Sequence, residues 1–313
     1  MVKVENNRFN HIFTHLSKRY IHNNTKFVPK PYKSAKNFNA LEFLVTFSTN
    51  CDNIIGVMKM FFKSKETIPE GMGFSTFGVT HLIWLLALAL FCGGAVIFYR
   101  KANAKTRKIA RTVLGASVVL LEIIKDIVVI AIGEFSFGYL PFHLCGINVL
   151  LIGFDVLKQT KAVRNFLYYF CIPGAMLALI FPNWTVLPCL NFMHIHSFII
   201  HAALVLYPLL LVTSGEVKPN IKDMPKCILL LIGMATPIYF INLACGTNFM
   251  FLMDPETGNP LGLFEQLLGS HLWGFLILLP IVMFIMYLPL FIASKCKKEK
   301  ETLRWEEKQE TTV

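Results

Sequence analysis

The chain has 313 residues, of which 55% are hydrophobic and only 16% are charged, and its mean hydropathy is +0.55. A soluble domain carries about 25% charged residues, so this composition excludes an ordinary soluble protein and predicts an all-α membrane protein. The formal net charge of +11 lies mostly in the terminal segments and short loops, which favours membrane lipids as partners and not nucleic acid.

The N-terminal part of the chain is polar. Residues 1–37 form a basic polar tail without the apolar core of a signal peptide. Residues 38–72 contain many apolar side chains, but Glu42 and Asp52 interrupt them. We therefore expect an amphipathic region that lies at the membrane interface. The alternative is an eighth span near residues 41–62.

Seven apolar segments follow within residues 73–294, and each is long enough to cross a hydrocarbon core about 30 Å thick. The expected fold is therefore a seven-transmembrane helix bundle. Residues 295–313 form a charged tail that is either helical or disordered. The seven segments run approximately over residues 77–99, 108–132, 140–157, 163–181, 191–213, 224–245 and 268–294.

The positive charge of the loops predicts the orientation of the bundle. Lys and Arg lie in the loops after the first, third and fifth segments and in the C-terminal tail, whereas the intervening loops contain neither. Cytoplasmic loops are enriched in Lys and Arg, so the C-terminus is expected in the cytoplasm and the N-terminus outside. The basic residues 1–37 oppose this orientation, but charge in long segments counts for less. We expect a multi-pass protein of the cell membrane.

Polar side chains within the segments gather on one side of the membrane. In the predicted orientation all six histidines of the segments fall in the outer half, and the inner half holds few polar groups. Polar groups in hydrocarbon usually face the bundle interior, so this pattern predicts a polar cavity in the outer half. The residues expected to bind a substrate there are His81, Lys125, Asp126, Asn148, His194, Asn248 and His271.

Residues 139–148 bring an imidazole, a thiol and an amide to the start of the third segment. His143 and Cys145 are two residues apart, so their side chains lie about 200° apart on a helix and cannot pair. A nucleophilic Cys145 therefore needs a base from another segment, and His201 is the best candidate because it lies deepest. The alternative is that Cys145 packs as a small apolar residue.

The second segment carries Glu122, Lys125 and Asp126 on one helix face, and the first two can form an ion pair. The group is either a neutralised stripe that tolerates membrane insertion or a carboxylate that orients a histidine from another segment, as in a catalytic triad.

Three histidines lie on the fifth segment. His194 and His201 are seven residues apart and share a helix face, whereas His196 points elsewhere. No metal site and no cofactor are predicted, because the cysteines and histidines lack the spacing of metal ligands. The catalytic candidates of the chain are His201, His143, Cys145 and Glu122.

Three motifs carry a family resemblance: LPFHLC (140–145), HSFIIHAALVLYP (196–208) and GTNFMFL (246–252). In this order and spacing they resemble the YwaF-type bacterial integral membrane proteins, over roughly residues 75–290. A more distant similarity is to the animal transmembrane acyltransferase that makes polyunsaturated ether phospholipids.

The second resemblance implies acyl transfer by a Cys/His pair within a similar helical bundle. In that relative the cysteine directly precedes the histidine at the start of the matching helix. Here Phe142 precedes His143, and Cys145 follows two positions later. His143 and His201 therefore match that relative better than Cys145 does.

Three functions remain open at the level of sequence. The first is an intramembrane acyltransferase or hydrolase that acts on a lipid. The second is a transporter or binding protein for a small polar solute or a proton, and the third is a structural membrane subunit. The lipid enzyme ranks first, because the polar groups gather in one half of the membrane and do not continue as a path across it.

Overall fold

The computed structural model describes residues 60–63, 65–69, 71–256 and 259–310, which belong to one compact unit. The predicted basic tail and most of the predicted interfacial region lie outside the described residues, as does most of the alternative span at 41–62.

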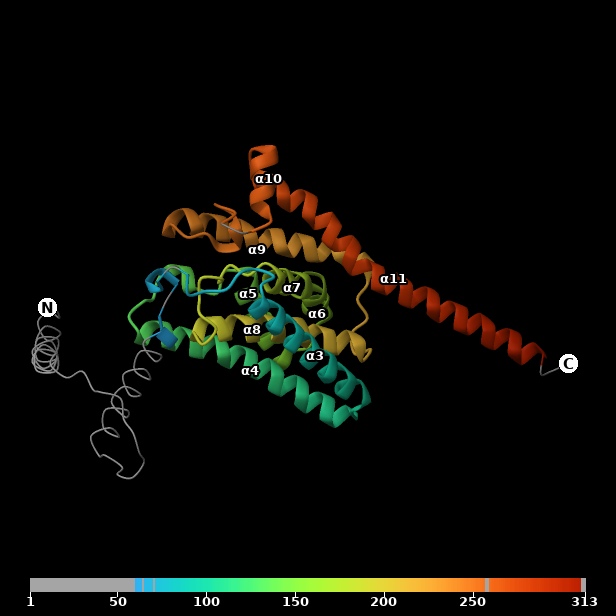
Figure 1. Ribbon diagram of the computed structural model, residues 1–313. Helices are drawn as coiled ribbons and strands as arrows, with labels where there is room; N and C mark the ends of the chain where they lie inside the picture. The colour runs from blue at the N-terminus through green and yellow to red at the C-terminus, as the bar shows by residue number, and fades with distance from the viewer. Residues whose placement is uncertain (1–59, 64, 70, 257–258, 311–313) are drawn as a thin grey trace, which may run out of the picture. The chain divides into compact units, whose positions relative to one another are not determined.

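The described part of the chain is helical and contains no β-strand, as the composition predicts (Figure 1). The long elements are α3 (Val79–Lys101), α4 (Ala104–Ala131), α5 (Leu144–Leu157), α6 (Lys161–Phe166), the π-helical turn η3 (Leu167–Cys171), α7 (Ile172–Ile180), α8 (Phe192–Thr213), α9 (Met224–Cys245), α10 (Leu261–Leu268) and α11 (Leu272–Glu310). Short 3-10 turns are η1 (Lys65–Thr67), η2 (Phe137–Tyr139), η4 (Ile221–Asp223) and η5 (Phe249–Phe251).

The prediction of several membrane-crossing helices is confirmed for five helices, which are long and apolar enough to span a bilayer. Helix α5 is apolar but has only 14 residues. Helix α4 has 28 residues, but Glu122, Lys125 and Asp126 interrupt its apolar part. The five spans are Val79–Lys101, Lys161–Ile180, Phe192–Thr213, Ile221–Cys245 and Leu272–Ile292.

Two predicted boundaries are wrong, and local capping explains both. Helix α4 begins at Ala104 and not near 108, because the side chain of Asn103 accepts a hydrogen bond from the Thr106 N–H at 2.9 Å. The last predicted segment starts too early, because Gly269 adopts φ 75° and ends the separate helix α10.

Helix α8 forms the centre of the packed core. It contacts α3, α4, α5 and α7. In its most apolar stretch of 18 residues, 67% of the residues are buried, against 6% in the corresponding stretch of α3. Helices α4 and α5 pack closely because Gly115 has no side chain: a Cβ there would lie 2.4 Å from Val156 Cγ2. Helices α4, α5 and α8 therefore hold their facing side chains in close contact.

A second cluster connects the C-terminal helices to the bundle. Tyr169 of η3, Cys227 of α9 and Met283 of α11 belong to one buried group. Large apolar side chains such as Phe91 and Phe284 are exposed on the outer surfaces of α3 and α11. Such surfaces suit contact with lipid, because lipid tails are as apolar as these side chains and burial inside the protein would give no hydrophobic gain.

Candidate functional site

A buried ionic group lies where α4 faces α8. Glu122 and Lys125 form the ion pair that their spacing predicts, and Lys125 Nζ is also 3.2 Å from Asp126 Oδ1. From α8, His196 Nε2 lies 3.9 Å from Glu122 Oε2. Glu122 is therefore shared between a lysine of its own helix and a histidine of another.

The charges of this group do not balance without a proton. Glu122 and Asp126 are two carboxylates, whereas Lys125 is one ammonium group. The imidazole of His196 interacts with the backbone of Leu121, and His196 Nε2 is buried without a hydrogen-bond partner in the described part of the chain. Unpaired charge is costly inside a membrane, so a proton on His196 or a carboxylate would neutralise the group.

Cys145 lies at the second position of α5, after the N-cap residue His143. Its thiol is within electrostatic range of Glu122 and Lys125, and it faces the backbone amides of Cys145 and Gly146. Gly146 makes this turn possible, because a Cβ there would lie 2.7 Å from the Cα of Pro141.

Asn148 lies three residues further along α5 and therefore on nearly the same face as Cys145. The residue is only 2% exposed, and its Oδ1 is buried with no hydrogen-bond partner among the residues that the structure describes. A buried amide oxygen without a partner costs free energy, so Asn148 is a candidate for contact with a ligand.

His201 lies about one turn and a half further along α8 than His196 and interacts with it electrostatically. Its Nδ1 is 2.7 Å from the carbonyl oxygen of Ser197, and its ring stacks on Trp184 with centroids 5.2 Å apart. A carbonyl oxygen only accepts hydrogen bonds, so Nδ1 carries the proton and Nε2 keeps a free lone pair. His201 thus has the tautomer that a general base requires.

Three predicted site residues hold the loop between α9 and α10. His143 Nδ1 accepts a hydrogen bond from the Met250 N–H at 3.3 Å, and His271 Nε2 donates to the Phe251 carbonyl at 3.0 Å. Asn248 Oδ1 accepts from the backbone of the next turn at 3.0 and 3.1 Å. Met250 has a φ of 58°, so these contacts support a strained loop conformation.

His81 and His194 form a third group at the start of α3 and α8. His81 Nδ1 accepts from the Phe77 N–H at 2.9 Å, while its Nε2 donates to the Leu179 carbonyl at 2.7 Å. His194 Nδ1 lies 3.2 Å from the Leu187 carbonyl. Both nitrogens of His81 are engaged with the backbone, which is the environment of a histidine that holds loops in place.

A second buried polar network lies at the end of the bundle that the predicted orientation assigns to the cytoplasmic side. Asp155 is fully buried near the end of α5, where it pairs with Arg164 Nε at 2.8 Å and accepts from the Tyr207 hydroxyl at 2.9 Å. At the same end of the bundle, Arg111 is paired with Glu216. The sequence does not reveal this network, because its charged residues lie close to predicted loops, where charged side chains are common and usually solvated.

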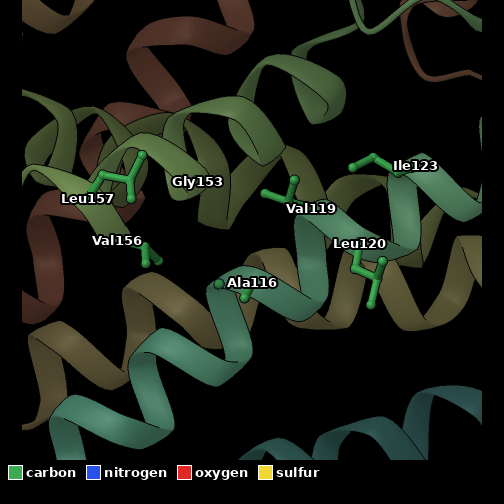
Figure 2. A pocket seen from close by; sticks show the side chains of 8 residues that line it. Ala116, Val119, Leu120, Ile123, Gly153, Val156 and Leu157 are labelled. Carbon is green, nitrogen blue, oxygen red and sulfur yellow. The ribbon is translucent and has the colours of Figure 1, made fainter.

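An apolar groove of about 380 Å³ runs along the contact between α4 and α5 (Figure 2). Leu120 and Leu157 at its rim are 56% and 87% exposed, so the groove opens on the apolar outer surface of the helix pair. Ile123 directly follows Glu122, which places one end of the groove close to the ionic group. Its lining is Gly115, Ala116, Val119, Leu120, Ile123, Gly153, Val156 and Leu157.

The sequence analysis assigns no catalytic or binding role to His196, because this residue does not share a helix face with His194 and His201. That spacing is consistent with the structure, in which His194 faces the Leu187 carbonyl and His196 faces Glu122. Spacing shows which side of a helix a residue occupies, but it does not show which neighbour covers that side.

Fold and site define a multi-pass helical membrane protein with a carboxylate–lysine–histidine group buried between its helices. The chain belongs to the TMEM164 family, whose family model matches residues 76–290. Comparisons with curated proteins and with solved structures found no match. The resemblance to YwaF-type proteins stays a prediction.

Proposed function

We propose that this membrane protein is an intramembrane lipid enzyme that transfers or hydrolyses an acyl chain. The observation that carries the proposal is the position of Glu122, whose carboxylate lies 3.9 Å from His196 of α8 and within electrostatic range of the Cys145 thiol. A cysteine at a helix N-terminus beside a proton-accepting pair is a common arrangement for a nucleophile.

In the proposed reaction, the thiol proton of Cys145 passes to the Glu122–His196 pair, where an imidazolium offsets the surplus carboxylate. The thiolate Sγ attacks the ester carbonyl carbon of the lipid, the ester C–O bond breaks, and the lysolipid oxygen takes up the proton. The acyl thioester is then attacked by the hydroxyl of an acceptor, or by water, which restores the thiol. In this proposal the side-chain amide nitrogen of Asn148 and the first backbone amides of α5 stabilise the oxyanion.

The two histidines of α8 have different parts in this proposal. The sequence points to His201 as the base, but the carboxylate that a base needs lies beside His196. We therefore assign proton transfer to His196 and a positioning role to His201, which interacts electrostatically with His196 and is held by the Ser197 carbonyl.

The remaining predicted site residues have supporting roles. His143, Asn248 and His271 hold the loop that covers the start of α5, while His81 and His194 hold the loops around α3 and α8. Substrate contact is proposed for Lys125 and Asp126, whose charges could bind a polar head group.

The groove between α4 and α5 fits the acyl chain of the substrate. It is lined by aliphatic side chains and glycine (Figure 2), and one of its lining residues, Ile123, directly follows Glu122. An alkyl chain gains little by leaving lipid for another apolar surface, so the groove would orient the chain and determine its length more than it would add affinity.

Acyl transfer by the purified full chain tests the proposal. With a labelled phospholipid and a lyso-acceptor, we expect Cys145→Ala to abolish transfer and Cys92→Ala to retain it, because Cys92 lies on α3 away from the ionic group. We also expect Ala116→Phe, which fills the groove, to disfavour long acyl chains. Turnover that survives in Cys145→Ala would reject the covalent step.

No turnover by the folded wild-type protein across several lipid classes would reject the enzyme altogether. Saturable binding of a small polar solute under those conditions would then favour transport, in which the same ionic group binds the solute or a proton.

We further propose that α4 and α5 complete seven crossings, with the N-terminus outside and the C-terminus in the cytoplasm of a cell-membrane protein. Cys189 is exposed in the loop before α8, and Lys218 follows α8. In a chain without other cysteines, an impermeant maleimide should label Cys189 in intact cells and should label Lys218→Cys, with Cys189 replaced, only after permeabilisation. The reverse pattern would invert the orientation.

A further inference from the structure

A second cavity, of about 520 Å³, lies at the end of the bundle where α3 connects to α4. The proposed lipid reaction does not use it. Its lining carries three cations and one carboxylate. The lining residues are Ala102, Ala104, Arg107, Lys108, Arg111 and Glu216.

Hydrogen bonds make the floor of this cavity rigid. Arg111 is 8% exposed and is paired with Glu216, which also accepts a hydrogen bond from the Tyr99 hydroxyl at 2.8 Å. Arg107 Nε donates to the Tyr99 carbonyl at 2.9 Å, and Arg107 Nη2 donates to the Arg100 carbonyl at 2.6 Å. The guanidinium of Arg107 is therefore held at the wall of the cavity and does not move freely.

The positive charge around the cavity exceeds the negative charge that compensates it. Six Lys and Arg residues fall within residues 100–111, whereas Glu216 is the one carboxylate paired with any of them in the described part of the chain. Lys108 has neither a hydrogen-bond nor an ion-pair partner among the described residues. The first turn of α4 adds the positive end of a helix dipole. The excess charge fits an anionic ligand.

The position of the cavity along the bundle indicates that the anion belongs to a lipid head group. Ile97 and Phe98, in the last turns of α3, are 57% and 62% exposed, as expected for side chains that face lipid. Arg100 and Lys101 follow after the buried Tyr99. The cavity thus lies at the level where apolar surface gives way to charge, which is the level of lipid head groups.

We propose that this cavity binds the phosphate of an anionic lipid head group, with Arg107 and Lys108 as the principal contacts. Arg107 supplies a fixed planar donor and Lys108 a mobile charge, a combination suited to phosphate oxygens. The ligand is a resident lipid that is distinct from the proposed acyl substrate, whose site involves Cys145 and Glu122.

Binding of dioctanoyl phosphatidic acid to the purified full chain in neutral detergent tests the proposal. We expect saturable binding that weakens about tenfold or more in the double variant Arg107→Gln/Lys108→Gln. The matched control Lys218→Gln/Lys222→Gln removes the same charge from another basic loop and should weaken binding less than about twofold. Equal losses in both pairs would show diffuse attraction and overturn the site.

Two further arms complete the test. Lys108→Glu leaves the hydrogen bonds of Arg107 intact, so a folded Lys108→Glu protein that binds as the wild type does would also overturn the proposal. Dioctanoyl phosphatidylcholine should bind weakly. If it binds as tightly as phosphatidic acid, the cavity does not select for the negative charge of the head group. Inorganic phosphate that binds as tightly as phosphatidic acid would reject the lipid as the source and assign the cavity to free phosphate.

Discussion

Replacing Asp155 with alanine is expected to lower the free energy of unfolding by about 3–5 kcal/mol, because it leaves the Arg164 charge without its partner inside the protein. Asp155 is fully buried, and its two oxygens bind Arg164 Nε and the Tyr207 hydroxyl. Arg164 Nη2 is already buried without a hydrogen-bond partner in the described chain, so the guanidinium has no replacement nearby. Thermal unfolding of the purified protein in detergent would measure the loss.

The control for this experiment is Lys161→Ala, which removes an exposed ion pair with Asp223 and should leave the melting temperature near that of the wild type. The triple variant Asp155→Leu/Arg164→Met/Tyr207→Phe should recover much of the stability, since apolar side chains replace the buried ion pair and the hydroxyl bonded to it at little cost. If Asp155→Ala melts as the wild type does, the buried network does not stabilise the bundle.

Replacing His196 with alanine is expected to lower the proposed acyl transfer about 10²–10⁴-fold, the usual contribution of a general base. Glu122→Gln should cause a similar loss, because it removes the carboxylate that offsets an imidazolium at His196. His201→Ala should reduce transfer less, since His201 positions His196 in our proposal. Initial rates with a labelled phospholipid would be compared across the three variants.

The matched control is His194→Ala, which removes a buried histidine of the same helix that faces the Leu187 carbonyl. It should keep the turnover per folded molecule, so melting curves are needed for every variant. Loss in His201→Ala with full activity in His196→Ala would return the role of base to His201.

Local features of this chain could be predicted because they depend on neighbours in the sequence. The apolar segments follow from composition and length, and the Glu122–Lys125 pair follows from the helical repeat. The separate faces of His194 and His196 follow from the same repeat. The helix boundaries were less certain, since the Asn103 cap and the Gly269 turn are single-residue effects.

Contacts between helices could not be predicted in the same way. The sequence treats the six histidines as one outer group. The structure divides them among Glu122, the loop after α9, the loops around α3 and α8 and, for His201, the Ser197 carbonyl of its own helix. Asp155, Arg164 and Tyr207 also meet from three helices. No local pattern relates these residues to one another.

The sequence by itself determined that this is a helical multi-pass membrane protein and showed where its polar side chains lie along each helix. Only the tertiary structure decided that Glu122 faces His196, that Asp155 is neutralised inside the bundle and that α4 and α5 leave an apolar groove. The physical reason is that a helix repeat gives the direction of a side chain within its own helix. The partner of that side chain depends on how neighbouring helices rotate and pack, through contacts such as Gly115 against Val156 that lie far apart in the chain.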